Sequence, residues 1–383
     1  EAFLFSQAEF RHNVITHHCE IRWTEEAGFL PLTDRDVNTL WGRMNKTVGR
    51  VYLTDIYNVI HSEFVPLFNP FQSYFDHLPS WDGVSDPIGD LADTVHVKSD
   101  QAEFRDYFRK WFVGILPALL DDTVVNHEIL VLIGEQGLYK TTWFNFLLPP
   151  ELRCYFYTKT NSDRLNKDDL FSLTEFALIC FEELDGMRPA ELNQLKAMVT
   201  MPYVNERAAY GRNKERHPHI ASFCGTGNNV QFLTDPTGNR RWLPFEVSQI
   251  RDPHLHAIPY ELVYSQAYAL WKSGFCHWFS QEEIRKLNMH NSRFEVPNLE
   301  EDLIRTHFRK PFEGEAGIFV TAADILEQIS SCLRYPLSPN KIGRIMAGLE
   351  FESIRYKGKR GYITVKKTGE DIDRERRSGA LGL

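Results

Sequence analysis

The sequence predicts an α/β fold with a parallel sheet at its centre, and three short, mostly apolar runs carry that prediction. They are residues 129–133, 176–181 and 220–225. Each run ends in polar or small residues, and the stretches between them are long enough to hold a helix. Residues 99–250 are therefore the predicted core domain.

The first run leads into a glycine-containing turn, a Lys-Thr pair and a helix that must end at Pro149. This is the order of a P-loop, in which backbone N–H groups and the positive end of the helix bind phosphate. Lys140 supplies a charge at the β- and γ-phosphates and Thr141 can hold Mg²⁺, so ATP and Mg²⁺ are the expected cofactors. The expected ATP-binding residues are Gly134, Gln136, Gly137, Tyr139, Lys140, Thr141 and Thr142.

Tyr139 departs from the P-loop pattern, which has glycine directly before the lysine. The backbone passes closest to the phosphates here, so the tyrosine side chain must point outward or the loop must open slightly. The loop taken alone leaves one alternative, a buried strand and turn followed by a surface lysine.

The second run ends in acids. Parallel sheets place functional groups at the carboxyl ends of their strands, and in P-loop enzymes one such carboxylate holds Mg²⁺ while a neighbour polarises the attacking water. Glu182 and Glu183 are candidate catalytic residues, and with Thr141 and Asp185 they are candidate metal ligands. A solvated acidic turn is the alternative.

Two further stretches supply candidate catalytic residues. Asn228 follows the third run, where an amide can orient the attacking water or sense the γ-phosphate. Arg240 and Arg241 lie on a glycine turn before another strand. Adjacent arginines point in different directions, so one can pair locally while the other reaches a neighbouring subunit's nucleotide as an arginine finger.

The net charge of −9 means that nucleic acid can be bound only by a local basic surface. Residues 205–219 are basic and contain a glycine turn, which predicts a hairpin with a cationic tip near 212–217. A solvated loop is the alternative. The expected DNA-binding residues of this segment are Arg207, Arg212, Lys214 and Arg216.

Residues 301–367 have the helix, capped helix and hairpin order of a winged helix. Its second helix carries Lys341 and Arg344, and the expected DNA-binding residues of its wing are Lys357, Lys359 and Arg360. Many winged helices join only proteins, so DNA contact by this domain is one of two open alternatives.

The flanking regions are less specific. Residues 1–98 are predicted to alternate short strands with helices, as a helical region with a connector, and two of its helices begin at caps Thr33 and Thr54. Residues 251–300 read as a helical extension and 368–383 as a polar tail. The six cysteines are scattered, and neither a membrane-spanning run nor a signal-peptide pattern is present, so we expect a reduced, cytoplasmic protein without membrane contact.

Taken in order, five motifs resemble those of the virulence-associated E family of mobile-element and prophage replication proteins. They are residues 134–142, 182–186, 209–212, 223–228 and 235–242. The resemblance implies a bacterial, superfamily 3 type AAA+ helicase core that forms a homo-oligomer, in this case a hexameric ring. It also implies ATP-driven movement on single-stranded or forked DNA, with the 205–219 hairpin facing the channel, and a possible replication or primase partner domain.

Two other functions remain open at this level. One is a nucleotide-dependent switch or defence ATPase that unwinds nothing. The other is a degenerate P-loop scaffold that binds DNA or a partner through its winged helix, and Tyr139 is its direct support.

Overall fold

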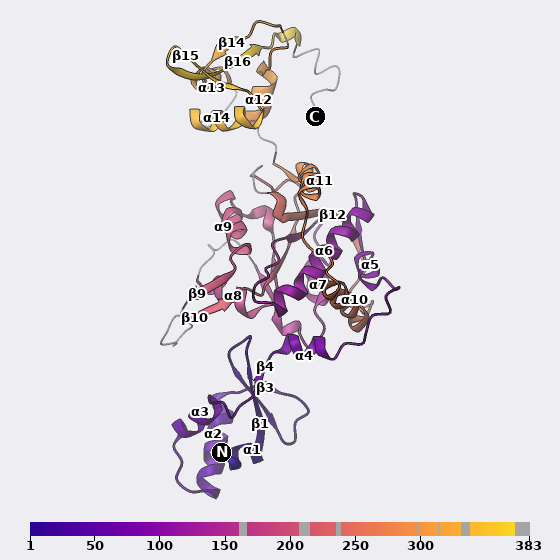
Figure 1. Cartoon of the computed structure of the whole chain (residues 1–383), viewed down its shortest axis with the longest axis vertical. Helices are drawn as coiled ribbons and strands as arrows, with labels where there is room; N and C mark the ends of the chain where they lie inside the picture. The colour runs from indigo at the N-terminus through magenta and orange to yellow at the C-terminus, as the bar shows by residue number, and fades with distance from the viewer. Residues whose placement is uncertain are drawn as a thin grey trace. The chain divides into compact units, whose positions relative to one another are not determined.

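The computed structural model describes residues 1–160, 167–206, 215–234, 239–296, 299–312, 314–330 and 338–371. The chain divides into two compact units, Glu1–Glu295 and Val296–Leu383 (Figure 1). The first unit contains the predicted core together with the whole amino-terminal region. The second begins a few residues before the predicted boundary at 301.

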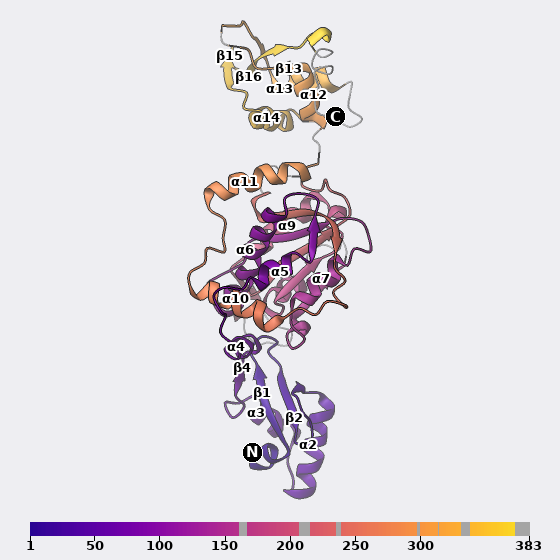
Figure 2. The ribbon, with the colours of Figure 1, turned by 90° about the vertical axis from the view of Figure 1, so that its right-hand side faces the viewer.

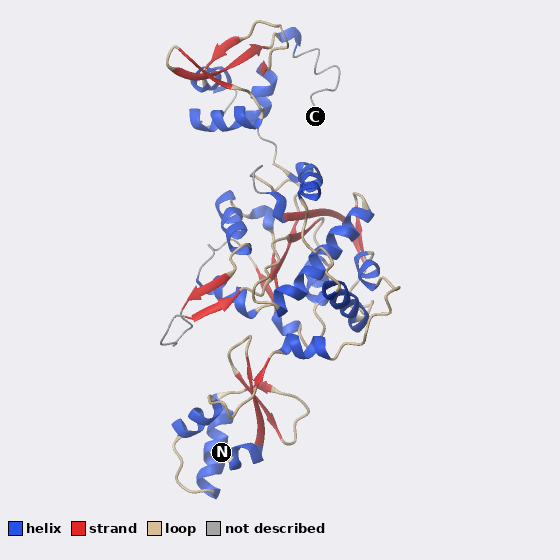
Figure 3. Ribbon diagram, in the orientation of Figure 1, coloured by secondary structure: helices blue, strands red, loops and turns tan. Residues whose placement is uncertain are grey.

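A six-stranded sheet forms the centre of the first unit, between helices (Figure 3). Its strand order is β5-β12-β6-β11-β8-β7, and only β5 runs antiparallel to its neighbour. The strands are β5 (Val95–Val97), β6 (Ile129–Ile133), β7 (Phe156–Lys159), β8 (Leu178–Phe181), β11 (Ser222–Gly227) and β12 (Trp242–Ile250). The predicted parallel sheet is therefore confirmed.

The strand β6 shows why its run is apolar throughout. Its five side chains alternate between two hydrophobic clusters, Leu130 and Leu132 in one and Ile129, Val131 and Ile133 in the other. All five are fully buried. A strand covered on both faces has no solvent-facing position, so it loses the polar alternation of a surface strand.

The register of the parallel strands brings three strand ends to one edge of the sheet. Ile133 at the end of β6 pairs with Gly227, and Phe181 at the end of β8 pairs with Gly225. The turns that follow β6, β8 and β11 therefore lie together. This is the edge at which open α/β sheets bind their ligands.

Helices of the first unit pack around this sheet. They are α4 (Pro70–Asp76), α5 (Pro87–Ala92), α6 (Gln101–Leu120), α7 (Lys140–Leu147), α8 (Lys167–Glu175), α9 (Pro189–Val199), α10 (Tyr260–Lys272) and α11 (Gln281–Asn291). Short 3₁₀ turns are η1 (Arg153–Tyr155), η2 (Leu184–Gly186), η3 (Asn239–Arg241) and η4 (Ser292–Phe294). Within the described parts of the chain, no helix has both the length and the apolar character needed to cross a membrane.

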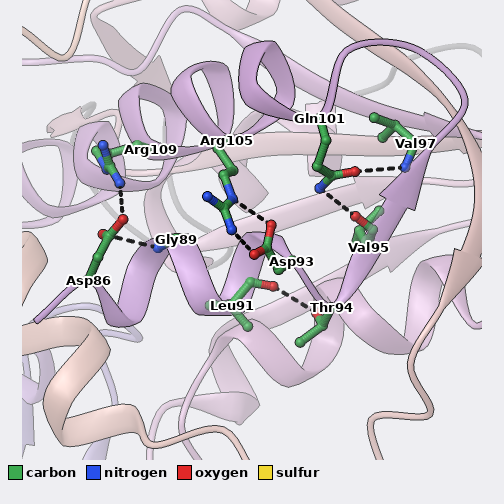
Figure 4. Close-up of polar contacts among 10 residues, drawn as sticks. All are labelled: Asp86, Gly89, Leu91, Asp93, Thr94, Val95, Val97, Gln101, Arg105 and Arg109. Atoms are coloured by element: carbon green, nitrogen blue, oxygen red, sulfur yellow. Dashed lines mark hydrogen bonds and ion pairs between the residues drawn. The ribbon is translucent and has the colours of Figure 1, made fainter.

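One face of α6 anchors the edge of the sheet through three polar residues spaced four apart (Figure 4). The Gln101 amide bonds to the β5 backbone at 2.9 and 3.1 Å. Arg105 pairs with Asp93, and Arg109 pairs with Asp86, the residue that caps α5. Because residues four apart share a helix face, one side of α6 holds both α5 and β5 in place.

The amino-terminal region combines helices with a four-stranded sheet of order β3-β2-β1-β4, in line with the predicted alternation of short strands and helices. The strands are β1 (Ala8–Asn13), β2 (Cys19–Trp23), β3 (Leu30–Pro31) and β4 (Leu67–Phe68), and the helices are α1 (Ala2–Gln7), α2 (Asp34–Thr47) and α3 (Leu53–Ile60). Two of these strands, β3 and β4, are only two residues long.

Of the two helix caps predicted in this region, one is confirmed and one is wrong. Thr33 caps α2 in a reciprocal capping box with Asp36, which confirms the first cap. The second cap is wrong, because α3 begins at Leu53 and its N-cap is Tyr52. The Asp55 carboxylate accepts the Tyr52 N–H at 3.0 Å, so an acid in the first turn satisfies the N–H of the N-cap residue.

The strands β9 (Tyr203–Glu206) and β10 (Glu215–Pro218) form a separate antiparallel pair (Figure 3). Their pairing confirms the predicted hairpin. Most of the predicted tip lies outside the described residues. Arg216 and His217, which the sequence placed in that tip, belong instead to the β10 stem.

The second unit has its own small core. Its helices are α12 (Leu299–His307), α13 (Ala322–Ser330) and α14 (Pro339–Gly348), and its strands are β13 (Phe308–Arg309), β14 (Ile318–Val320), β15 (Ser353–Tyr356) and β16 (Lys359–Lys366). The strand β16 pairs antiparallel with the other three. The helices pack against this sheet in both views (Figures 1 and 2).

Candidate functional site

The loop of residues 134–139 leads from β6 into α7, and two of its glycines are required by geometry. A Cβ on Gly134 would lie 2.9 Å from the carbonyl oxygen of Val247, which is too close for any other residue. Gly137 has a φ of +89°, a backbone conformation that side chains disfavour. The loop can therefore pass close to β12 and turn sharply before the helix.

Tyr139 occupies the position before Lys140 in a left-handed conformation, with φ 60° and ψ 17°. Such a conformation costs a non-glycine residue about 1–2 kcal/mol. The Tyr139 side chain is 43% exposed and borders the cavity described below. The loop thus keeps the left-handed turn that glycine usually provides, and the tyrosine is accommodated by backbone strain.

Lys140 is 8% exposed and folds back into the loop. Its Nζ donates hydrogen bonds to the carbonyl oxygens of Gly134 and Glu135 at 2.6 and 2.8 Å, and it lies 3.4 Å from Oδ1 of Asn228. Burial lowers the pKa of Lys140, and the negative charge of Asp185 acts in the opposite direction. The ammonium group is thus held beside a helix N-terminus, where phosphate oxygens are favoured.

A cavity of about 400 Å³ lies between the loop and the ends of β8 and β11. Nine of its lining residues were singled out from the sequence: Gln136, Gly137, Tyr139, Lys140, Thr141, Thr142, Glu182, Glu183 and Asn228. Three were not: Leu138, Thr226 and Gly227. Most of the predicted site is therefore brought together around one space.

The two acids after β8 have different surroundings. The Thr141 Oγ1 donates a 2.8 Å hydrogen bond to Oε1 of Glu182, which joins the first turn of α7 to the end of β8. Glu183 is exposed and adopts a left-handed φ of 54°. Glu182 is thus engaged by the first turn of α7, while Glu183 is the exposed carboxylate of the cavity.

Asp185, the third acid that the sequence offers as a candidate metal ligand, bonds to the segment after β11. Its carboxylate accepts the backbone N–H groups of Asn228 and Asn229 at 3.2 and 3.0 Å. Within the described residues, no three His, Cys, Asp or Glu side chains come together as a metal-binding group. The spacing along the chain could not show that the η2 turn directs Asp185 toward β11.

Asn229 is a residue that the sequence analysis missed. Its side-chain Nδ2 donates a 2.6 Å hydrogen bond to Asp185, beside the bond from its own backbone N–H. The available signal was the pair of asparagines directly after an apolar strand. Only one of them was expected to act at the site.

Arg240 and Arg241 lie at the opposite edge of the sheet. The next residue, Trp242, begins β12 and pairs with Ile129, the first residue of β6, whereas the P-loop follows the last. The arginines are therefore about one strand length, roughly 15 Å, from the cavity of their own chain. Arg240 is exposed, whereas Arg241 is partly buried near Glu128. Burial lowers the pKa of Arg241 and raises the pKa of Glu128 to about 7.

The predicted DNA-binding residues fall in two places. Arg207, Arg212 and Lys214 lie outside the described residues. The guanidinium carbon of Arg216 lies 3.3 Å from the centre of the Tyr203 ring, across the β9–β10 stem. In the second unit, the exposed residues Lys357, Lys359 and Arg360 belong to the turn and second strand of the β15–β16 hairpin.

Comparisons with known proteins give a family and several structural likenesses. Residues 76–296 match the virulence-associated protein E-like domain. The apo C-terminal region of NrS-1 is similar over 96% of this chain and 98% of that chain, at 12% identity and a TM-score of 0.49. A Thermotoga maritima RuvB mutant matches over 71% of this chain and 94% of that chain, at 10% identity and a TM-score of 0.26. The S. cerevisiae Hsp104–ADP complex matches over 75% of this chain and 44% of that chain, at 12% identity and a TM-score of 0.28. No curated protein sequence matches. Because the matched segment spans more than half of the 383 residues, the chain belongs to the virulence-associated protein E-like domain family.

Proposed function

We propose that this protein is an ATP-hydrolysing motor that moves along single-stranded or forked DNA during replication of a mobile genetic element or prophage. The observation that carries the proposal is the convergence of Lys140, Thr141 and Glu182 at one edge of the sheet, with Thr141 and Glu182 joined at 2.8 Å. Phosphoryl transfer needs positioning and charge neutralisation more than covalent chemistry, and these groups supply both.

The side chains present fit ATP and Mg²⁺. The Thr141 hydroxyl and the Glu182 carboxylate are hard oxygen donors of the kind Mg²⁺ prefers, so these two residues would hold the ion. Lys140 and the loop N–H groups would hold the phosphates. When bound, Mg²⁺ supplies positive charge that neutralises the phosphate oxygens. The cavity of about 400 Å³ falls within the range of about 300–1,000 Å³ typical of small-molecule pockets.

The remaining side chains divide the other tasks. Lys140 would exchange the carbonyl oxygens that it now contacts for phosphate oxygens. Glu183 would orient the attacking water and accept its proton, because its carboxylate is the exposed one in the cavity. Asn228 would hydrogen-bond the water or the γ-phosphate from the end of β11.

The position of Arg240 supports a composite site between subunits. An exposed arginine at the edge opposite its own cavity cannot serve that cavity, but it can reach the cavity of a neighbouring copy. Such head-to-tail contacts close into rings, and a hexamer is the form we propose. An isolated protomer would then hydrolyse ATP slowly, since an arginine finger contributes on the order of 10³-fold or more to the rate.

The β9–β10 hairpin would supply the DNA contact of the ring. Arg216 lies on the ring of Tyr203 and is exposed, and Arg207, Arg212 and Lys214 precede it in the same segment of the chain. Copies of one hairpin around a channel would concentrate positive charge inside the ring, although each chain carries a net charge of −9.

We further propose that the second unit is a winged helix that contacts DNA through its wing. Its order is helix α12, strand β14, helices α13 and α14, then the β15–β16 hairpin. Lys341 of α14 is exposed but paired with the buried Glu300, so part of its charge is already balanced. The exposed cations of the hairpin, Lys357, Lys359 and Arg360, are better placed for phosphate.

The test is steady-state ATPase activity over a series of protein concentrations, with and without single-stranded DNA. We expect specific activity to rise with both. Lys140→Ala should abolish turnover, and Lys286→Ala, which changes an exposed lysine of α11, should not. Complete inactivity of the wild-type chain would favour the scaffold. ATPase activity that depends on neither protein concentration nor DNA would favour a switch ATPase. An assay of strand displacement on forked DNA distinguishes such a switch from a helicase.

A further inference from the structure

The Asp185 carboxylate holds the segment that follows β11. Its Oδ1 accepts the N–H of Asn228 at 3.2 Å, and its Oδ2 accepts the backbone N–H and the side-chain Nδ2 of Asn229 at 3.0 and 2.6 Å. A Cβ on Gly227 would lie 3.1 Å from Oδ1, so the carboxylate also packs against the last residue of the strand. One side chain thus fixes three consecutive residues.

These bonds use most of what the carboxylate can accept. An ionised carboxylate has about four acceptor positions, and three are occupied by N–H donors of a single segment. A metal bound by both carboxylate oxygens would displace at least one of these hydrogen bonds. The geometry therefore gives Asp185 a different task from Glu182, which bonds to Thr141.

The turn that carries Asp185 is locked to β11 at a second point. Leu184 is fully buried, and a Cβ on Gly225 would lie 2.2 Å from its Cδ1, so the leucine fills the space that a side chain at Gly225 would take. The η2 turn directly follows Glu183. Leu184 and Asp185 thus join the turn after β8, which carries the exposed Glu183, to the segment after β11.

The same segment touches the P-loop lysine from the other side. Oδ1 of Asn228 lies 3.4 Å from Nζ of Lys140, and the Gly134 N–H bonds to the carbonyl oxygen of Gly227 at 3.1 Å. The three turns at this edge of the sheet therefore contact one another in sequence, and Asp185 supplies the charged link between two of them.

We propose that Asp185 is a positioning residue that holds Asn228 beside Lys140 and couples it to Glu183, so that the acid and the amide respond together to the phosphate end of a nucleotide. This proposal rests on the proposed ATPase function of the cavity. Asp185 itself touches neither phosphate nor metal, and it acts through the residues that it holds.

The test compares Asp185→Ala, Asp185→Asn, Asn229→Ala and the double variant Asp185→Ala/Asn229→Ala in the full chain. In Asp185→Ala we expect faster hydrogen exchange at the Asn228 and Asn229 amides and a fall in kcat of about 10- to 100-fold, as for a misplaced catalytic group. The KM for ATP and the Mg²⁺ requirement should stay unchanged. Asp185→Asn retains one acceptor and should be intermediate, and the Asn229 change should add little once Asp185 is gone.

Three results would overturn the proposal. A raised Mg²⁺ requirement in Asp185→Ala would make Asp185 a metal ligand. Unchanged amide exchange and kcat would remove the coupling. The loss in Asp185→Ala would be merely structural if Asp185→Asn turned over no faster and if Asn229→Ala lowered kcat equally with or without Asp185. If the wild-type chain hydrolyses no ATP, the proposed function fails instead, and amide exchange in the same variants still decides whether Asp185 holds the segment.

Discussion

The Oγ1 atom of Thr141 donates a 2.8 Å hydrogen bond to Oε1 of Glu182, and this bond links α7 to the end of β8. The helix α7 follows β6, and β8 lies two strands from β6 in the sheet. If the pair holds Mg²⁺, Thr141→Ala should raise the Mg²⁺ concentration needed for half-maximal ATPase activity by about 10- to 100-fold, the usual effect of losing a partner at a metal site. A Mg²⁺ titration of activity measures it. Thr39→Ala, at an exposed threonine of α2, is the control. An unchanged Mg²⁺ requirement would place the ion elsewhere.

Tyr139 stores strain in the loop, and its removal is measurable. Tyr139→Gly should raise the free energy of unfolding by about 1 kcal/mol, because glycine adopts a φ of 60° without a Cβ clash and loses some of that gain to backbone entropy. Tyr139→Ala keeps the left-handed cost and should give no gain. Urea unfolding of both variants distinguishes the cost of the φ angle from the cost of the tyrosine ring. Equal stabilisation by Ala and Gly would show that the ring, not the φ angle, is unfavourable.

Glu103 and His290 tie α6 to α11, and their pairing predicts a pH-dependent stability. Nδ1 of His290 lies 2.9 Å from Oε2 of Glu103, and the hydrogen-bonded contact between the two side chains lowers the pKa of Glu103 below 4.5. A pKa that is lower in the folded chain gives stability that is complete above pH 4.5 and disappears as the pH falls through the lowered value.

Glu103→Gln should therefore lower the free energy of unfolding at pH 7 by about 1.5–3 kcal/mol, and the difference from wild type should shrink below pH 4.5. Chemical denaturation at several pH values measures it. The matched control is Glu282→Gln in an exposed pair with Lys286, for which about 0–1 kcal/mol is expected. A difference that is the same at every pH would mean that the ionised form of Glu103 is not what stabilises the contact.

Local patterns predicted the strand β6, the Thr33 cap and the composition of the cavity, because burial on two faces and first-turn capping leave marks within a few residues. The role of Asp185 left no such mark. It depends on the pairing of Phe181 with Gly225, which sets two turns side by side although more than forty residues separate them. Register between distant strands is a tertiary property, and spacing in one sequence does not specify it.

The position of the arginine pair was unpredictable for the same reason. The sequence placed Arg240 and Arg241 before a strand, but only the pairing of Trp242 with Ile129 puts them at the edge away from the P-loop. The amino-terminal region was expected to contain short strands, but the bounds of β3 and β4 could not be predicted, because two residues are too few to show a period of two.

The wing of the second unit should contribute to DNA binding by charge. Replacing Lys357, Lys359 and Arg360 together by Ala should weaken binding at low salt and reduce the slope of log K against log salt by about 2–3, as three lost phosphate contacts require. Fluorescence anisotropy over a salt series measures the slope. The control makes the same charge change at the exposed lysines Lys46, Lys272 and Lys286. Equal slopes for the two triple variants would attribute the effect to net charge and leave the wing without a specific role.

Arg240 offers a direct test of a site shared between subunits. The Arg240→Ala chain has an intact cavity but cannot supply an arginine to its neighbour. The Lys140→Ala chain can supply the arginine but has a disabled cavity of its own. Each variant alone should bind DNA but show almost no turnover, and only the first should still bind ATP. When the two are mixed in equal amounts, about one quarter of head-to-tail interfaces would join an intact cavity to an intact arginine, so activity should reappear. Failure to recover activity in mixtures that do assemble would mean that Arg240 acts within its own chain or not at all.

Repeating the mixture with Arg241→Ala in place of Arg240→Ala then identifies which arginine crosses the interface. The partly buried Arg241 beside Glu128 is expected to support the fold, so this mixture should give no such recovery.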